Sequence, residues 1–160
     1  MGLRKMLLRI GINWRNKYSR TVQRTETKWE PLVPADLNAL QTFIHMTYIW
    51  TKDSLLDNIQ SIQHMNWQLE HTGKIRGDCD DLATYSSYLL LRMKYTQVIR
   101  VNIWEERHVI CAFSISNGWQ VVDNRKMHPP YYGSLHKSIL QRSEYDELVT
   151  ISEHMSLPIP

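Results

Sequence analysis

The spacing of apolar residues changes near residue 96 of this 160-residue chain. Before that point apolar residues recur every three to four positions, as on one face of an α-helix. Residues 97–123 instead alternate apolar and polar side chains, as in strands that are covered on one face. Helices followed by an antiparallel sheet, in a chain of this length, predict one domain of the α+β class.

The same spacing gives approximate bounds for the elements. Helices are predicted over residues 37–50, 54–65, 80–95 and 135–142. Strands are predicted over residues 97–106, 107–115, 119–124 and 148–151. Residues 66–79 are a loop by composition, and Ser116-Asn117-Gly118 is a hairpin signal between two strands.

Positive charge is concentrated at the N-terminus. Residues 1–28 carry eight Lys or Arg and one Glu, a net charge of +7, whereas the remaining residues carry eleven and fifteen, a net charge of −4. We therefore divide the chain into a basic arm or helix, 1–28, and a domain, 29–160. The arm either caps the domain with a solvated basic side or docks an anionic membrane, a nucleic acid or a protein partner.

Composition also indicates a compartment. No apolar stretch approaches the roughly 20 residues that cross a bilayer, so no transmembrane segment is predicted. The first apolar run, Met6-Leu7-Leu8, is too short for an export signal. Two cysteines do not form a disulfide scaffold. We expect a cytoplasmic protein with reduced thiols.

Cys79 lies among acidic residues in Gly-Asp-Cys-Asp-Asp, residues 77–81, at the start of a predicted helix. Free N–H groups and the positive end of the helix dipole favour a thiolate there. The flanking aspartates oppose this by raising the pKa of the thiol, so a nearby cation is needed. An imidazolium supplies that charge, and imidazole supplies a general base. Without such a partner, Cys79 is a small buried residue at a helix start.

Two facing strands carry the missing partners. His108 begins the apolar strand of residues 107–115, and Asp123 ends the strand of residues 119–124. A cysteine at a helix start, a histidine on a strand and an aspartate on the next strand are the nucleophile, base and orienting group of a catalytic triad. The hypothesis depends on the combination, because each residue alone is commonly structural.

The register of the two strands decides whether His108 meets Asp123. A tight Asn117-Gly118 turn places both on one face but four residues apart, about 13 Å. Direct opposition requires residues 114–117 as a four-residue loop. We predict that longer loop, or a bulge of similar offset. Cys111 falls on the opposite face from His108 and is predicted to be a core thiol.

The motifs Gly-Asp-Cys-Asp-Asp-Leu-Ala, His-Val-Ile-Cys-Ala-Phe and Val-Val-Asp-Asn occur in this order. Together they resemble the transglutaminase-like superfamily of cysteine proteases. They look closest to the bacterial transglutaminase-like cysteine proteinases, whose pattern is Gly-Asp-Cys-Glu-Asp-x-Ala, then a strand histidine, then Leu-Asp-Asn. The resemblance covers about residues 67–124.

The resemblance implies a papain-like α+β fold, in which the nucleophile begins a helix packed on a small antiparallel sheet. It implies a triad of Cys79, His108 and Asp123 that attacks an amide of a protein or peptide and forms a thioester. No cofactor is required for that chemistry. Water as acceptor gives hydrolysis, whereas an amine acceptor gives transglutaminase-type acyl transfer.

The resemblance extends to residues beside the triad. Trp67 is either a wall of the core or cleft or a contact to substrate, and Gln68 could donate to an oxyanion as a glutamine does in papain-like enzymes. Some members bind calcium through the acidic residues next to the cysteine, which are Asp78 and Asp80 here. Asp80 is shorter than the Glu that is commoner at that position.

A function of another class is compatible with the same fold. The domain could be a non-catalytic binding or assembly module that docks through residues 1–28. An intact triad favours the thiol-dependent amide hydrolase.

Overall fold

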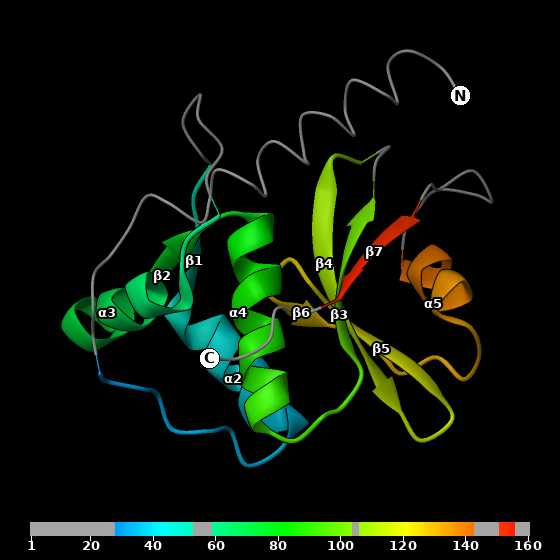
Figure 1. The fold of residues 1–160 in the computed structure, drawn as a ribbon, viewed down its shortest axis with the longest axis horizontal. Coiled ribbons are helices and arrows are strands. Elements are labelled where there is room, and N and C mark those ends of the chain that lie inside the picture. Colours follow the sequence, from blue (N-terminus) through cyan, green and yellow to red (C-terminus); the bar gives the residue numbers. More distant parts are fainter. Residues whose placement is uncertain (1–27, 53–58, 104–105, 143–150, 156–160) are drawn as a thin grey trace.

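The computed structural model describes residues 28–52, 59–103, 106–142 and 151–155. They form an α+β fold (Figure 1). The helices are α2 (Leu37–Thr47), α3 (Ile62–Thr72), α4 (Cys79–Arg92) and α5 (Leu135–Arg142). The strands are β1 (Tyr48–Trp50), β2 (Ile75–Gly77), β3 (Val98–Ile103), β4 (His108–Ile115), β5 (Gly118–Asp123), β6 (Lys126–Met127) and β7 (Ile151–Met155). The basic arm lies outside the described residues, apart from Lys28.

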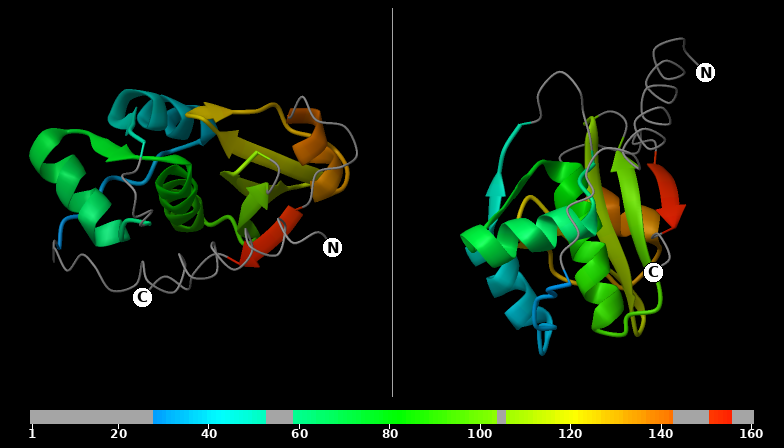
Figure 2. Two further views of the ribbon diagram at one scale, coloured as in Figure 1. Left: turned by 90° about the horizontal axis from the view of Figure 1, so that it is seen from above. Right: turned by 60° about the vertical axis from the view of Figure 1, so that its left-hand side comes forward.

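Five strands form one antiparallel sheet in the order β6-β5-β4-β3-β7. A second, small sheet pairs β1 with β2 in parallel. Helix α4 lies along one face of the large sheet and α5 lies on the other (Figure 2). The central strand β4 therefore has a helix on each side.

Alternating side chains of β4 enter two separate cores. Cys111 and Phe113 pack with α2, α3 and α4 in the larger cluster. Ile110 and Ala112 pack with α5 in the smaller one. This alternation confirms the prediction that Cys111 is a core thiol: it is fully buried, and the Ser87 hydroxyl of α4 donates to its sulphur over 3.3 Å.

Helix α4 forms where the sequence predicts a helix. Asp78 is its N-cap, and Asp81 completes a capping box by accepting from the Asp78 N–H. The apolar residues at helical spacing are buried, among them Leu82, Tyr85 and Leu89. No helix among the described residues is both long enough and apolar enough to cross a membrane.

Two predicted bounds are wrong. Residues 66–72 belong to helix α3 and are not a loop; Ser61 caps its start, and Gly73 ends it with a φ of +68°. The helix predicted over residues 37–50 ends at Thr47, because the next three residues pair with β2. The helix predicted over residues 54–65 falls partly on residues outside the described ranges.

The β4–β5 connection also differs from the prediction. Ile115 pairs with Gly118, so Ser116 and Asn117 form a tight two-residue turn and not a four-residue loop. The register lies midway between the two that the sequence suggests. It keeps His108 and Asp123 on one face, as predicted.

We expect Gly118→Ala to destabilise the protein through a steric clash. A Cβ at this position would lie 2.0 Å from the backbone carbonyl oxygen of Tyr131, which pairs with Trp119. Backbone cannot move aside as a side-chain end can, so the free energy of unfolding should fall by about 2 kcal/mol or more.

Gly73→Ala is the matched control for that prediction. A Cβ at residue 73 meets nothing within 4 Å, so only the left-handed backbone conformation should cost stability, about 1 kcal/mol. Urea unfolding measures both changes. Equal losses for the two variants would contradict the clash at Gly118.

Candidate active site

The backbone before Cys79 is held closely by buried side chains. The Tyr48 hydroxyl donates to the Asp78 carbonyl oxygen over 2.6 Å. A Cβ on Gly77 would lie 2.5 Å from a carboxylate oxygen of Asp81 and 2.6 Å from that hydroxyl. Glycine is therefore needed at residue 77 for the approach of Asp81 and Tyr48, and not only to clear space for a substrate.

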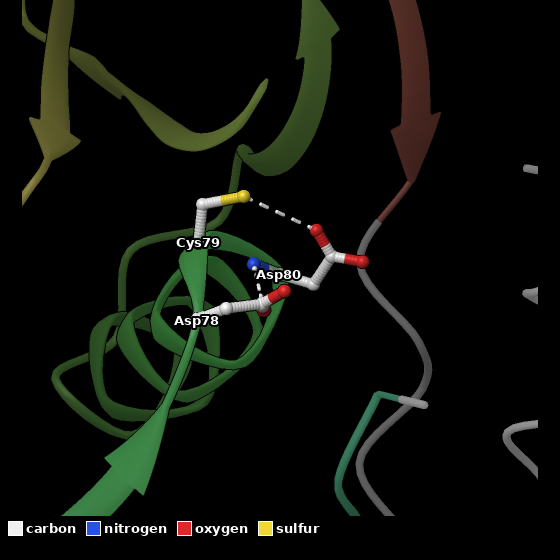
Figure 3. Close-up of side chains that lie close together, drawn as sticks. All are labelled: Asp78, Cys79 and Asp80. Carbon is white, nitrogen blue, oxygen red and sulfur yellow. Dashed lines mark hydrogen bonds between the residues drawn. The ribbon is translucent and has the colours of Figure 1, made fainter. Parts of the chain in front are cut away.

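The sulphur of Cys79 lies at the first residue of α4, near the start of β4 (Figure 3). The thiol donates to the Asp80 carboxylate over 3.5 Å. The backbone N–H of Val109, next to His108, also lies within hydrogen-bonding reach of the sulphur. Contact between α4 and β4 thus brings the cysteine to the strand end that carries the histidine.

Burial raises the pKa of the Cys79 thiol far above its ordinary value. The negative charges of Asp80 and then Asp78 raise the pKa further, while the hydrogen bond from Val109 lowers it. Burial and the two carboxylates prevail, so the sulphur carries its proton at neutral pH. Any nucleophilic role then requires a base that removes this proton.

His108 and Asp123 form the closest polar contact of the site. The Nε2 atom of His108 lies 2.5 Å from an Asp123 carboxylate oxygen. The Asp123 side chain is only 4% exposed and that of His108 is 14% exposed. A buried carboxylate at Nε2 fixes the orientation of the ring and favours the tautomer whose other nitrogen, Nδ1, accepts a proton.

Asp123 reaches His108 along a diagonal. Regular pairing of β4 with β5 ends at Cys111 and Val122, so Asp123 continues toward Ile110, two residues from His108. That offset is about 7 Å along the strand, and side chains reach diagonal neighbours across an antiparallel pair. From the sequence we predict that His108 lies directly opposite Asp123, which is a different register of β4 and β5 from the one that forms.

A tight turn after Asp123 fixes the end of β5. Asn124 and Arg125 both have positive φ, +46° and +65°, as the type I′ turn of a two-residue hairpin requires. The Gln41 side chain of α2 donates to the Arg125 carbonyl over 2.8 Å and accepts from the N–H of Met127. Helix α2 therefore holds the hairpin that positions the aspartate.

The triad predicted from the sequence is assembled in two parts. His108 and Asp123 are joined, and Cys79 lies against the backbone of the residue next to His108. The sulphur's own hydrogen bond goes to Asp80.

Gln68 and Trp67 lie in α3. The amide nitrogen of Gln68 donates to Gln60 over 2.6 Å, and its oxygen accepts from the Arg76 N–H over 2.7 Å. The Gln68 amide thus links the Gln60 side chain to the Arg76 backbone, and its predicted contact to an oxyanion stays a prediction. Trp67 is half-buried, and its ring stacks with His71 at 4.7 Å and with His64 at 5.9 Å.

The predicted calcium ligands do gather. One side-chain donor atom from each of Asp78, Cys79 and Asp80 lies within 4.8 Å of the others (Figure 3). Calcium prefers six to eight oxygen ligands. The cluster offers two carboxylates and a thiol, and one Asp78 oxygen already caps α4 by accepting from the Asp80 N–H. This set of ligands fits calcium poorly.

The sequence analysis missed the most buried polar residue of the site. Asp81 is 0% exposed and accepts from both the backbone and the side chain of Gln60. Burial raises the pKa of Asp81 to about 7, although those hydrogen bonds lower it. The capping pattern of two aspartates three residues apart was visible, but the contact with Gln60, 21 residues away, was not.

Comparison with known proteins gives no match: no family model fits the chain, and no curated protein and no solved structure is similar to it.

We expect Asp80→Asn to make Cys79 more reactive. Removing the nearer negative charge should lower the pKa of the thiol and move the pH profile of iodoacetamide alkylation to lower pH, with a several-fold faster rate near about pH 8. Asp78→Asn keeps a good N-cap and should give a smaller shift in the same direction. Mass spectrometry of the Cys79 peptide against time measures the rate.

Asp80→Glu is the control, because it retains the charge and should leave the profile nearly unchanged. A profile unaffected by Asp80→Asn would contradict the electrostatic origin of the raised pKa.

Proposed function

We propose that this chain is a thiol-dependent amide hydrolase, a cysteine peptidase or amidase of the transglutaminase-like kind. In this proposal Cys79 is the nucleophile, His108 is the general base and then the general acid, and Asp123 orients the imidazole. A protein or peptide is the substrate. The resemblance of the motifs around these three residues to that superfamily supports the same assignment.

The buried contact between His108 and Asp123 carries the proposal. A carboxylate that is nearly inaccessible to water and lies 2.5 Å from a ring nitrogen is costly unless the imidazole shares the charge or the proton. The partly exposed ring retains Nδ1 for a second partner, and the sulphur of Cys79 lies beside Val109, the next residue of the strand. The pair of His108 and Asp123 matches the base and orienting group of a triad, which supports the proposal.

The reaction begins from a neutral thiol, because burial and two carboxylates raise the pKa of Cys79. His108 Nδ1 removes the proton as the sulphur attacks the carbonyl carbon of the amide, which gives a tetrahedral oxyanion. The backbone N–H of Cys79, with the positive end of the α4 dipole, stabilises the developing charge. His108 then donates its proton to the departing amine.

The second half of the reaction releases the acyl group. Collapse of the tetrahedral species leaves a thioester on Cys79, and His108 removes a proton from water as it attacks. The acid product leaves and the thiol regains its proton. An amine in place of water would transfer the acyl group, so the acceptor separates hydrolysis from transglutaminase-type transfer.

We expect Cys79→Ala to abolish amide cleavage, while Cys111→Ala retains it. Cys111 is fully buried on the α4 side of β4, where a substrate carbonyl cannot reach its sulphur, so it cannot replace Cys79 as nucleophile. Mass-spectrometric identification of new N-termini in a proteome-derived peptide library measures the cleavage. New N-termini produced equally by Cys79→Ala would exclude the proposed nucleophile.

We expect Asp123→Asn to lower kcat by roughly 10³-fold with little change in KM, because an amide at this position favours the wrong tautomer of His108. Circular dichroism before and after the assay checks that the variant is folded. A kcat close to that of the wild type would show that Asp123 does not orient the base.

A further inference from the structure

We propose that Asp81 is a positioning residue for Cys79, which acts by holding the start of α4 against the end of β4. The inference rests on the proposed function, since it assigns a role in that same site. Asp81 is the third residue of α4 and does not itself meet the reacting atoms.

Three N–H groups converge on the buried Asp81 carboxylate. One oxygen accepts from the Gln60 backbone over 2.7 Å. The other accepts from the Gln60 side chain over 2.7 Å and from the Asp78 backbone over 3.3 Å. Both carboxylate oxygens therefore accept from donors, and these donors come from two segments of the chain.

Gln60 extends this network to two further elements. Its side-chain nitrogen also donates to the Arg76 carbonyl of β2 over 2.6 Å, and its oxygen accepts from Gln68 of α3. Gln68 in turn accepts from the Arg76 N–H. The two glutamines thus form hydrogen bonds with the backbone N–H and carbonyl of Arg76, as a neighbouring strand would.

The network fixes the peptide units on the N-terminal side of Cys79. Asp81 holds the Asp78 N–H, while Tyr48 holds the Asp78 carbonyl. A side chain at residue 77 would displace Asp81 and Tyr48, because its Cβ would lie 2.5 Å and 2.6 Å from their oxygens. Both backbone groups of Asp78, the residue directly before the nucleophile, are therefore held. This places the Cys79 sulphur where the backbone N–H of Val109 can reach it.

A capping box alone does not require this arrangement. A capping box is made within four residues at the helix start, whereas two of the three donors to Asp81 come from Gln60, 21 residues earlier. Full burial of the carboxylate is also unusual for a cap, since aspartate is almost never fully buried unless it is paired. The additional contacts join α3, β2 and α4 at the point where the nucleophile begins.

Asp81→Asn tests this role. Asparagine has nearly the same shape, but its NH₂ group must face at least one of the three donors. We expect kcat for amide cleavage to fall about 10-fold or more with KM nearly unchanged, because small displacements of a nucleophile cost rate more than binding. Assay near about pH 8 keeps the aspartate of the wild type mainly ionised.

Gln60→Met is the second variant, since it keeps the length of the side chain and removes its polar atoms. If Asp81 acts through Gln60, the loss of kcat in the double variant should be close to that of the larger single loss and not the product of the two. Gln60→Met also keeps the test available if Asp81→Asn does not fold.

Ile139→Ala is the control for stability. Ile139 is a fully buried residue of α5, on the other face of the sheet, so this variant should lower Tm without changing kcat. If Asp81→Asn lowers Tm and also leaves kcat equal to that of Ile139→Ala, Asp81 is only a structural cap and the inference is overturned.

Alkylation separates this inference from the proposed function. In a Cys111→Ala background, loss of the Val109 contact should slow iodoacetamide alkylation of Cys79 at fixed pH at least about threefold in Asp81→Asn, whether or not the chain cleaves amides. Absence of amide cleavage with this slower alkylation would overturn the hydrolase and retain the positioning role. Alkylation at the rate of the Ile139→Ala control would overturn the positioning role alone.

Discussion

The packing of α4 along β4 is the contact on which the rest of the site depends. Alternate residues of β4, Cys111 and Phe113, enter the core beneath α4, and Ser87 bonds to the Cys111 sulphur. With the helix seated in this way, its first residue meets the first residues of the strand. The nucleophile candidate and the base candidate are 29 positions apart in the sequence, and this single helix–strand contact brings their backbones together.

Side-chain amides complete the frame where regular strand pairing ends. Gln41 holds the turn after Asp123 by hydrogen bonds to two backbone groups. Gln60 and Gln68 hold the backbone carbonyl and N–H of Arg76, which precedes Cys79 in the chain. An amide has one donor group and one acceptor, like a peptide unit, so it can substitute for a missing strand neighbour. Both ends of the candidate site are thereby fixed without additional strands.

The electrostatics of the site suit a base-dependent thiol. Asp80 and Asp78 keep the proton on Cys79, while Asp123 lies against His108. Charge on the sulphur is costly beside two carboxylates, so it is favoured only when the imidazole has taken the proton. Under the proposed function, the carboxylates suppress the free thiolate, and His108 as general base supplies it at the moment of attack.

The sequence by itself determined the class of the elements, because periods of 3.6 and 2 reflect which faces are buried. It placed α5 at its observed bounds and α4 to within three residues, and it put His108 and Asp123 on one face of the sheet. Only the tertiary structure decided the β4–β5 register, the short β1–β2 pair and the role of Gln68, since each depends on contacts between distant segments. The diagonal contact of His108 with Asp123 lies beyond the last regular pair of β4 and β5, and it leaves no periodic signal in the sequence. The hydrogen bonds of the buried Asp81 with Gln60 leave none either. Local pattern thus identified the candidate residues of the site, and packing determined their arrangement.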